Sequence, residues 1–523
     1  MNGKPIALIS VSDKTGVGEL GLALVKSGWR ILSTGGTAAA LRDCGVEVSE
    51  VSSYTGFPEI MGGRVKTLQP KIHGGILARR GEDEAVMRAH GIEGIDLVAV
   101  NLYPFADTVA NPGCSLNDAI EQIDVGGPAM LRAAAKNHQH VTVLVDPSDY
   151  ADIISALPSA PTVEQRQRLA IKGFAHTAAY DAQISQYLEE QNSDPRSENQ
   201  QNQENQPLPS VINLALELIN PLRYGENPHQ AAAVYRTRQQ AEPGLAGTRP
   251  LQGKALSYNN LLDADAAWSG LQLLGPDQPA CVIVKHSNPC GVATGSQLHK
   301  AWERALACDP TSAFGGIVAL NRPLDIELAE VLADRFLEVI IAPGIDDDAL
   351  EKLARKKNLR VLIPEASDAH AMEIKAIDGG WLVQQPDQAD DALDLQIATE
   401  RAPEDHELSD LKLAWAVVRM VRSNAIVYVK DGATVGIGAG QMSRVDSSRI
   451  GTLKAQDAGL SLAGAAMASD AFFPFADSIE TAAGHGIRSV IQPGGSMRDQ
   501  EVIDACNAND IAMVLTGRRH FRH

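Results

Sequence analysis

One stretch of the sequence ends an apolar run with two side chains suited to proton transfer. In VIVKHSNPCG, residues 282–291, three β-branched residues are followed by Lys285 and His286. Such a run is typical of a buried strand, and the NPCG that follows predicts a turn beginning at Asn288. A lysine and a histidine at a strand end can act as acid and base. The same pattern also fits a solvated loop, so both interpretations stay open.

Two turns near the N-terminus have the composition of an anion site. SVSDKTG, residues 10–16, and STGGT, residues 33–37, each follow an apolar run and precede a helical pattern. Backbone N–H groups at a helix start, hydroxyls and the ammonium of Lys14 together suit a phosphate. Neither turn has the spacing of a P-loop. Two capped turns without a ligand are the alternative.

Further basic and acidic side chains follow in the same half of the chain. GGRVKTLQPKIHGGIL, residues 62–77, gathers basic residues between glycines, with a solvated loop as the alternative. These basic residues are Arg64, Lys66, Lys71 and His73. In DVGGPAMLRAAAK, Asp124 precedes a glycine turn and Lys136 lies about three turns along the expected helix. Lysines and carboxylates are plausible proton-transfer groups, but spacing alone does not bring them together.

The second half carries side chains that suit planar or anionic ligands. PLRYGENPHQ, residues 221–230, is rich in them, and SNAIVYVKDG and GIGAGQMSR supply Asn424 and Arg444. DAFFPFADSIETAAGHG predicts an aromatic surface near an acid, with a packed core turn as the alternative. The residues of that stretch are Phe472, Phe473, Phe475 and Asp477.

Two motifs fail on inspection. Gly436-Ile-Gly438-Ala-Gly440 begins like a dinucleotide fingerprint, but a third glycine is wanted where Gln441 stands, so no NAD is expected. The Pro-Cys pair before residue 291 resembles half of a zinc deaminase signature. It lacks the second cysteine and the H-x-E partner, so no zinc is expected.

Apolar runs and helical patterns alternate along the chain, which predicts an α/β fold. Strands are expected at 5–12, 29–34, 96–105 and 141–145 and a helix at 128–138, then strands near 280–285, 316–320, 425–429 and 434–438. A parallel sheet in the first half would gather ligands at the carboxyl ends of its strands. In the second half, VIVKHSNPCGVATG and IVYVKDGATVGIGAG share a strand, a lysine and glycines. This likeness hints at two copies of one unit.

Composition divides the chain and limits its partners. The Gln/Asn-rich stretch 191–210 predicts a linker between a domain at 1–190 and a second part at 211–523. The net charge of −19 argues against nucleic acid as the main partner. No run approaches a membrane span and the N-terminus is not a secretory signal, so no membrane partner is expected. Six scattered cysteines predict buried free thiols and a cytoplasmic location.

Together these stretches resemble the bifunctional enzymes that join AICAR (5-aminoimidazole-4-carboxamide ribonucleotide) transformylase to IMP cyclohydrolase in purine biosynthesis. The likeness runs along nearly the whole chain, through SVSDKTG, STGGTA, TGFPE, GGRVKTL, NLYPF, EQIDVGG, LRAAAKNH, LRYGENPHQ, SYNNLLDADAAW, VKHSNPCG, IIAPG, GIGAGQMSR and DAFFPFADSIE. It implies formyl transfer from 10-formyltetrahydrofolate, as co-substrate, to the 5-amino group of AICAR, then dehydrative ring closure to IMP. It also implies a methylglyoxal-synthase-like open sheet, two cytidine-deaminase-like subdomains and a homodimer.

The resemblance also implies roles for particular residues. His286 is similar to the family's base, while Lys285 would stabilise the oxyanion or assist the leaving group. In the transformylase part, the implied substrate contacts are Arg223, Tyr224, Gly315, Asn424, Arg444, Phe472, Asp477, Arg519 and His523. In the cyclohydrolase part, Lys66 and Lys136 resemble the catalytic lysines, and Tyr103 and Asp124 would orient the reacting groups. The implied nucleotide contacts there are Ser12, Asp13, Lys14, Thr34, Gly35, Gly36, Thr37, Arg64, Thr67, Asn101 and Val125.

Two other classes of protein stay open. A zinc-dependent deaminase acting on a purine base would be revealed by stoichiometric zinc. A nucleotide-binding sensor would bind AICAR without turning it over.

Overall fold

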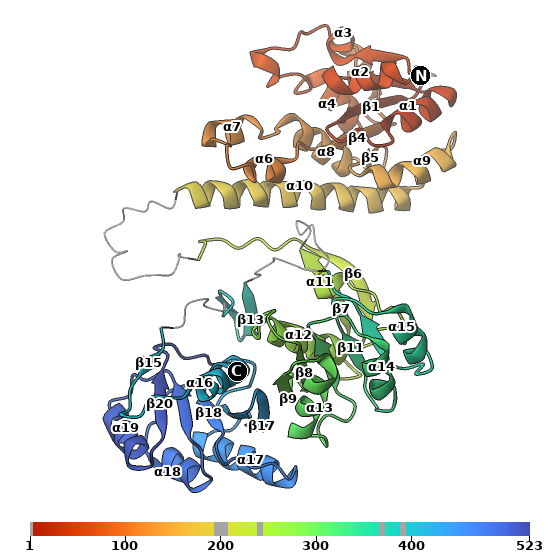
Figure 1. The fold of residues 1–523 in the computed structure, drawn as a ribbon. Helices are drawn as coiled ribbons and strands as arrows, with labels where there is room; N and C mark the ends of the chain where they lie inside the picture. Colours follow the sequence, from red (N-terminus) through yellow and green to blue (C-terminus); the bar gives the residue numbers. More distant parts are fainter. Residues whose placement is uncertain (1–3, 193–207, 238–243, 366–371, 388–393) are drawn as a thin grey trace. The chain divides into compact units, whose positions relative to one another are not determined.

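The computed structural model describes residues 4–192, 208–237, 244–365, 372–387 and 394–523. The chain divides into two compact units, Met1–Ala215 and Leu216–His523 (Figure 1). Most of the linker expected at 191–210 lies outside the described residues. Among the described residues, no helix is long and apolar enough to span a membrane.

The first unit is built on a five-stranded parallel sheet with the order β3-β2-β1-β4-β5. Its strands are β1 (Ile6–Val11), β2 (Arg30–Ser33), β3 (Val48–Glu50), β4 (Leu97–Asn101) and β5 (Thr142–Leu144). Its helices are α1 (Val17–Lys26), α2 (Gly35–Asp43), α3 (Val51–Thr55), η1 (Met61–Gly63), α4 (Pro70–Leu77), α5 (Glu84–Ala89), α6 (Phe105–Val109), α7 (Leu116–Glu121), α8 (Gly126–Lys136), η2 (Pro147–Asp149), α9 (Tyr150–Ala156) and α10 (Val163–Asn192). The expected parallel α/β arrangement is confirmed.

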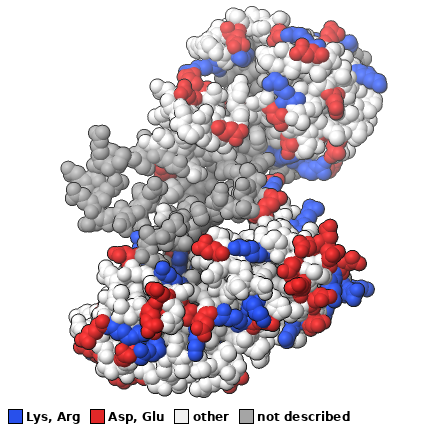
Figure 2. Space-filling view, in the orientation of Figure 1, with Lys and Arg blue, Asp and Glu red and all other residues white. Residues whose placement is uncertain are grey.

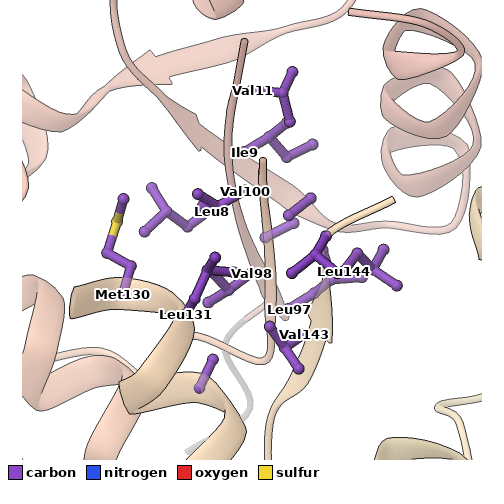
Figure 3. Packing of buried hydrophobic residues seen from close by; sticks show 14 of the residues in the cluster. Leu8, Ile9, Val11, Leu97, Val98, Val100, Met130, Leu131, Val143 and Leu144 are labelled. Atoms are coloured by element: carbon purple, nitrogen blue, oxygen red, sulfur yellow. The ribbon is translucent and has the colours of Figure 1, made fainter. Parts of the chain in front are cut away.

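The core of this unit lies between the sheet and its helices. Leu8 of β1, Val98 of β4 and Val143 of β5 are almost fully buried and pack with Leu131 of α8 (Figure 3). Helix α8 contacts both α4 and α10, and α1 contacts α2 and α9. Two such layers cover a parallel sheet, whose strands are apolar on both faces. The carboxyl ends of the strands are left to carry polar residues.

The second unit contains an eleven-stranded mixed sheet with the order β12-β11-β10-β8-β9-β17-β16-β18-β19-β20-β15. The first half of the unit comprises α12 (Tyr258–Gln272), β8 (Ala280–Lys285), β9 (Asn288–Thr294), α13 (Leu298–Cys308), β10 (Ile317–Leu320), α14 (Ile326–Ala333), β11 (Val339–Ile341), α15 (Asp347–Leu353) and β12 (Arg360–Leu362). The second half comprises α16 (Asp405–Val418), β16 (Ile426–Lys430), β17 (Ala433–Gly438), α17 (Arg444–Asp457), β18 (Ala466–Ser469), α18 (Asp477–Gly484), β19 (Ser489–Gln492), α19 (Asp499–Ala508) and β20 (Ala512–Leu515).

The two halves have the same order of elements, and their strands follow mirrored orders outward from the β9–β17 pair. The two stretches that share a lysine and glycines in the sequence form corresponding hairpins, β8–β9 and β16–β17. Outside the halves lie helix α11 (Gly244–Gly247), the ribbons β6 (Leu216–Leu222) with β7 (Ala232–Thr237) and β13 (Glu373–Ile377) with β14 (Gly380–Gln384), and the edge strand β15 (Gln396–Ile397).

Several expectations about local structure are wrong. The turn predicted at Asn288 is instead the start of strand β9, and the hairpin turns at His286 and Ser287. The strand expected at 96–105 ends at Asn101. The cysteines are all free, but two of them are not buried: Cys44, which caps the end of α2, is exposed, and Cys114 is half-buried.

Candidate active sites

The first candidate site lies at the carboxyl edge of the five-stranded sheet, where β1 and β4 end side by side. Asn101 is in register with Val11, and its side-chain oxygen accepts hydrogen bonds from the amides of Ser12 and Asp13 at 2.6 and 2.9 Å. Its own amide group donates to the Asp13 carbonyl at 3.0 Å. Hydrogen bonds from the hydroxyl and amide of Thr15 lower the pKa of Asp13. Asn101 therefore fixes the loop after β1.

The start of α2 forms a corner beside this loop. The predicted residues Thr34, Gly35, Gly36 and Thr37 form the cap and first turn of α2. The Thr37 hydroxyl accepts from the Val11 amide at 3.0 Å and donates to the Val11 carbonyl at 2.9 Å. Lys14 lies over this turn, because a Cβ on Gly36 would be 3.8 Å from the Lys14 Cε. A helix start with a nearby ammonium attracts an anion, so the corner can hold a phosphate.

Asp124 lies directly before α8 and is held from two sides. Its carboxylate accepts from the Gly127 amide at 2.8 Å, and its own amide donates to the Tyr180 hydroxyl at 2.8 Å. Burial raises the pKa of Asp124, although hydrogen bonds from backbone amides oppose the shift. Thr67 reaches the same helix start, because a Cβ on Gly126 would be 2.9 Å from its hydroxyl oxygen. Thr67 therefore lies against the start of α8, two residues after Asp124.

The other predicted side chains of this edge are accessible. Tyr103 and Val125 are 50% and 61% exposed. The Lys66 ammonium lies 2.9 Å from the carboxylate of Glu59. Arg64 forms an ion pair with the glutamate that ends α7. Both cations are thus held by carboxylates and remain partly open to solvent.

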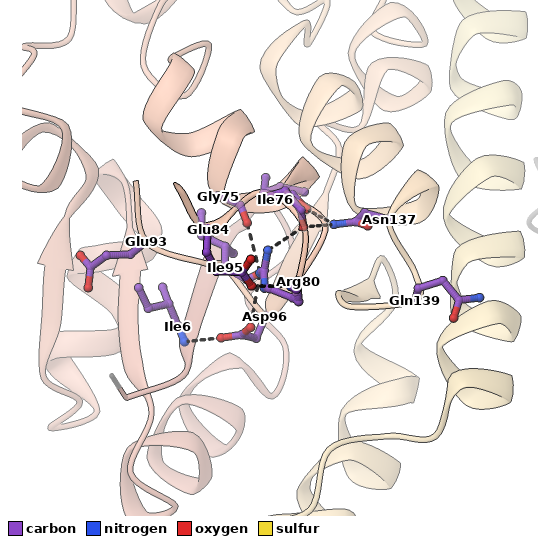
Figure 4. A network of polar contacts seen from close by, with 12 residues as sticks. Ile6, Gly75, Ile76, Arg80, Glu84, Glu93, Ile95, Asp96, Asn137 and Gln139 are labelled. Carbon is purple, nitrogen blue, oxygen red and sulfur yellow. Dashed lines mark hydrogen bonds and ion pairs between the residues drawn. The ribbon is translucent and has the colours of Figure 1, made fainter. Parts of the chain in front are cut away.

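An arginine network fixes the far end of the segment that carries these cations. Arg80 donates to the carbonyls of Ala78 and Ile95 at 2.8 and 2.9 Å and lies 3.4 Å from Asp96 (Figure 4). The other oxygen of Asp96 accepts from the Ile6 amide at 3.1 Å. Because Asp96 and Ile6 stand at the starts of β4 and β1, the network ties the end of α4 to the amino edge of the sheet.

Lys136 does not lie with the other predicted residues. It ends α8, ten residues after Gly126, which corresponds to about 15 Å along a helix. The next residue, Asn137, donates to the carbonyls of Ile76 and Ala78 at 2.6 and 3.0 Å (Figure 4). Lys136 therefore lies near the end of α4, at the opposite edge of the sheet from Asp124.

The second candidate site begins at the turn of the β8–β9 hairpin. His286 is exposed on this turn, and the Lys285 ammonium donates to the carbonyls of Phe314 and Gly315, both at 3.0 Å. Gly315 has φ +68°, and a Cβ there would be 3.0 Å from the Lys285 Nζ. Glycine is therefore needed at 315 for the lysine to take this position.

Helix α12 links this turn to the predicted AICAR-binding pair. The carboxylate of Asp263 accepts from both amides of the turn, and Asn259, one helical turn earlier, donates to the Glu226 carbonyl at 3.4 Å. Arg223 donates to the Tyr224 hydroxyl at 2.9 Å, and its guanidinium lies 4.7 Å from the centre of the Tyr224 ring. Residues four apart share one helix face, so α12 brings these two loops together.

A third group of predicted residues surrounds the C-terminal tail. Arg444 donates to the Ser469 hydroxyl at 3.0 Å and to the fully buried Asp470 at 2.8 Å. The guanidinium groups of Arg444 and Arg519 lie 6.0 and 4.7 Å from the centre of the Phe521 ring. Two cations therefore stand beside an aromatic ring, an arrangement suited to an anionic ligand that also has a planar part.

One hydrogen bond connects this group to the β8–β9 hairpin. The Asn288 side chain, at the start of β9, accepts from the Arg422 amide at 3.0 Å. Two residues after Arg422, the backbone and side-chain amides of Asn424 donate to the Gln441 carbonyl at 3.1 and 2.9 Å. The ring of His523 lies 5.5 Å from that of the tail phenylalanine. Asn424 and His523 thus belong to the same neighbourhood as Arg444.

The predicted aromatic surface is only partly present. Phe472 and Phe475 are 37% and 48% exposed, whereas Phe473 is fully buried in the core and is not part of any surface. Asp477 is exposed at the start of α18. Phe472 lies two residues after Asp470, the buried aspartate that binds Arg444. It is therefore at the same end of strand β18.

The glycines of the apparent dinucleotide motif have a packing role. A Cβ on Gly436 would be 2.4 Å from the Gly451 carbonyl, and one on Gly438 would be 1.8 Å from the Ser447 carbonyl. They therefore let α17 lie directly on β17. Cys290 is buried, which raises the pKa of its thiol to about 12. The described residues contain no group of three or more His, Cys, Asp or Glu arranged to hold a metal.

Comparison with known proteins assigns the chain to a family. Residues 134–454 match the family model described as AICARFT/IMPCHase bienzyme, and residues 16–129 match that of the MGS-like domain. The chain belongs to the AICARFT/IMPCHase bienzyme family. Membership gives it formyltransferase and IMP cyclohydrolase activities in purine biosynthesis. A solved structure described as "Crystal structure of ForH" shares 42% identity over 36% of this chain and 100% of its own, with a TM-score of 0.32.

Three residues with contacts in these sites were missed by sequence reasoning. Tyr180 comes from α10, 56 residues from the Asp124 amide that it binds, and no local pattern connects the two. Asp470 is buried beneath Arg444 and follows an ordinary strand. Asp263 stands within SYNNLLDADAAW, a stretch that the resemblance includes, but its spacing from His286 gives no sign of contact.

Proposed function

We propose that the chain catalyses the last two steps of IMP synthesis, with formyl transfer in the second unit and ring closure in the first. The observation that carries the proposal is the convergence of the segments 12–14, 34–37 and 101–103 at one edge of a parallel sheet, with the start of α8 after Asp124 against Leu102, which lies 2.7 Å from where a Cβ on Gly127 would stand. This edge combines a phosphate corner with an acid of raised pKa. Family membership supplies the two reactions, and the geometry of this edge supports ring closure in the first unit.

In formyl transfer, the 5-amino nitrogen of AICAR attacks the formyl carbon of 10-formyltetrahydrofolate. The new C–N bond forms, the bond from the formyl carbon to N10 breaks, and N10 gains a proton. His286 is exposed at a turn, where it can take the proton that the amine loses. Lys285 spends two of its N–H donors on carbonyls, which leaves one for the developing oxyanion. Arg223 and Arg444 suit the 5′-phosphate.

In ring closure, the carboxamide nitrogen of formyl-AICAR attacks the formyl carbon and water is lost. Asp124 accepts a hydrogen bond from the attacking amide, and Lys66 donates to the formyl oxygen. Lys14 and the start of α2 hold the phosphate. Few charges move, so holding the reacting atoms close supplies much of the rate. Lys136 has no assigned step, because in one chain it lies at the other edge of the sheet.

The test follows AICAR and 10-formyltetrahydrofolate by chromatography. The intact chain should produce IMP, and a Lys66→Ala variant should accumulate formyl-AICAR. A His286→Ala variant should consume no AICAR but should still close formyl-AICAR supplied to it. A Lys71→Ala variant is the matched control, since Lys71 comes from the same basic stretch but has no role in the proposed mechanism. Intact, folded chain that binds AICAR without consuming it would support a sensor instead.

We also propose that the chain acts as a homodimer in the cytoplasm. The ribbons β6–β7 and β13–β14 expose large apolar side chains, among them Leu216, Leu218 and Trp381 at 54%, 52% and 68%. A second copy is a natural partner for such surface. Acidic and basic side chains are interspersed on the face seen in Figure 2, and the formal net charge is −19. Sedimentation at micromolar concentration tests the dimer, and a monomer would refute it.

A further inference from the structure

The hairpin turn that carries His286 has a costly backbone conformation. His286 and Ser287 have φ values of 53° and 58°, in the left-handed region. For a residue with a Cβ this region is disfavoured, because the Cβ comes too close to the following carbonyl oxygen. Two-residue hairpin turns of this kind usually contain Asn, Asp or Gly. Something outside the turn must therefore stabilise it.

Asp263 provides that support from helix α12. Its Oδ2 accepts from the His286 amide at 3.2 Å, and its Oδ1 accepts from the Ser287 amide at 2.7 Å. One carboxylate thus binds the two consecutive backbone donors of the turn. Hydrogen bonds to a charged acceptor are stronger than those between neutral groups. In this left-handed conformation both amides point at the carboxylate on α12.

The other half of the unit offers an internal comparison. In the β16–β17 hairpin, Asp410 of α16 accepts from the amides of Asp431 and Gly432 at 2.7 and 2.6 Å. Their φ values are 52° and 78°. The carboxylate clamp is therefore a shared feature of both halves. In this half the turn is Asp-Gly, which adopts the conformation readily, whereas the other half places a histidine and a serine there.

We propose that Asp263 is a positioning residue for formyl transfer: it holds the backbone of His286 so that the imidazole faces the bound amine. The proposal rests on the role of His286 given above. Asn259, on the same face of α12, contacts the loop of the predicted AICAR-binding pair. Asp263 therefore sets the position of the base relative to the substrate as well as the shape of the turn.

The experiment compares Asp263→Ala with Asp410→Ala, its counterpart in the other half. Asp263→Ala should lower the kcat of formyl transfer by about 10- to 100-fold, the scale of a misplaced catalytic group. The KM for AICAR should stay within about twofold, because the AICAR-binding residues are intact. Asp410→Ala should leave formyl transfer unchanged. Its Tm should nevertheless fall by about as much as that of Asp263→Ala, because each variant loses one carboxylate clamp. Ring closure in the first unit should be unchanged in both variants.

A rescue variant separates positioning from general damage. Glycine adopts positive φ without strain, so Ser287→Gly in the Asp263→Ala chain should recover part of the lost kcat. If Asp263→Ala does not fold, Asp263→Asn serves, since it keeps the shape but replaces one acceptor with a donor. Near-normal kcat in the Asp263 variant, or an equal loss in Asp410→Ala, would overturn the proposal. Normal formyl transfer by His286→Ala would instead show that His286 is not the base, which would contradict the proposed function and not the clamp.

Discussion

Removing one hydroxyl from helix α10 should slow ring closure. The Tyr180 hydroxyl accepts from the Asp124 amide at 2.8 Å and donates to the Gln122 carbonyl at 3.3 Å. A Tyr180→Phe variant keeps the ring packed against Phe105 but leaves that half-buried amide unpaired. An unsatisfied buried donor costs about 1–3 kcal/mol. If this cost falls on the transition state, kcat drops roughly 5- to 150-fold.

The assay measures conversion of formyl-AICAR to IMP, with formyl transfer as an internal control. Tyr187→Phe is the matched variant, because its ring also meets Phe105 edge-on, with centroids 5.6 Å apart. It should close the ring at the normal rate. In an Asp124→Ala chain, Tyr180→Phe should have little further effect, since the two residues act as one unit. Additive losses, or a normal rate in Tyr180→Phe, would show that Tyr180 does not act through Asp124.

Three further outcomes are expected. Gly438→Ala should lower the free energy of unfolding of unit 2, measured in urea, by about 3 kcal/mol, because the added Cβ would overlap a helix carbonyl. Gly484→Ala, with open space around it, should lower it by less than about 0.5 kcal/mol. Equal effects would contradict the packing role of Gly438. Burial alone would raise the pKa of Asp146, but the Lys172 ammonium and nearby hydrogen-bond donors lower it to about 2. The stability that the ionised Asp146 contributes is therefore complete above about pH 4 and is lost as pH falls toward 2. Lys172→Met should flatten that part of an acid-unfolding curve, and an unchanged curve would count against the ion pair. Burial raises the pKa of Asp124, so the rate of ring closure should begin to fall, as the solution is acidified, at a pH above the usual range of carboxyl pKa values. A pH–rate profile measures this, and a fall only within the usual range would count against a role for Asp124.

The strand ends of the first unit could be predicted because hydrophobic periodicity is a local signal. Alternating apolar runs and helices imply a parallel sheet, and a parallel sheet places its carboxyl ends together. That is why Ser12 and Asn101, 89 residues apart, meet as expected. The position of Lys136 could not be predicted in this way. Its helix was predicted, but only the packing of α8 against α4 shows at which edge of the sheet that helix ends.

The turn of the β8–β9 hairpin could not be found from local chemistry. Asn288-Pro289 has the composition of a turn, yet these residues begin a strand, and the turn uses His286 and Ser287. The reason is a carboxylate 23 residues away that binds the turn amides. Long-range hydrogen bonds override local propensity here, and a local departure of this kind is most expected at a functional site.

The duplicated halves explain why chemistry is proposed at one turn and not at the other. The first strand of each hairpin ends in a lysine, but Lys430 donates to the Ala463 carbonyl at 2.6 Å, beside an Asp-Gly turn that carries no imidazole. Lys285 instead lies next to the exposed His286 and against a glycine that leaves room for its ammonium. The shared clamp makes either turn stable, so the residues on the turn are free to differ. In this view, Asp263 allows a histidine to occupy a position where the other half uses the residues that the backbone itself prefers.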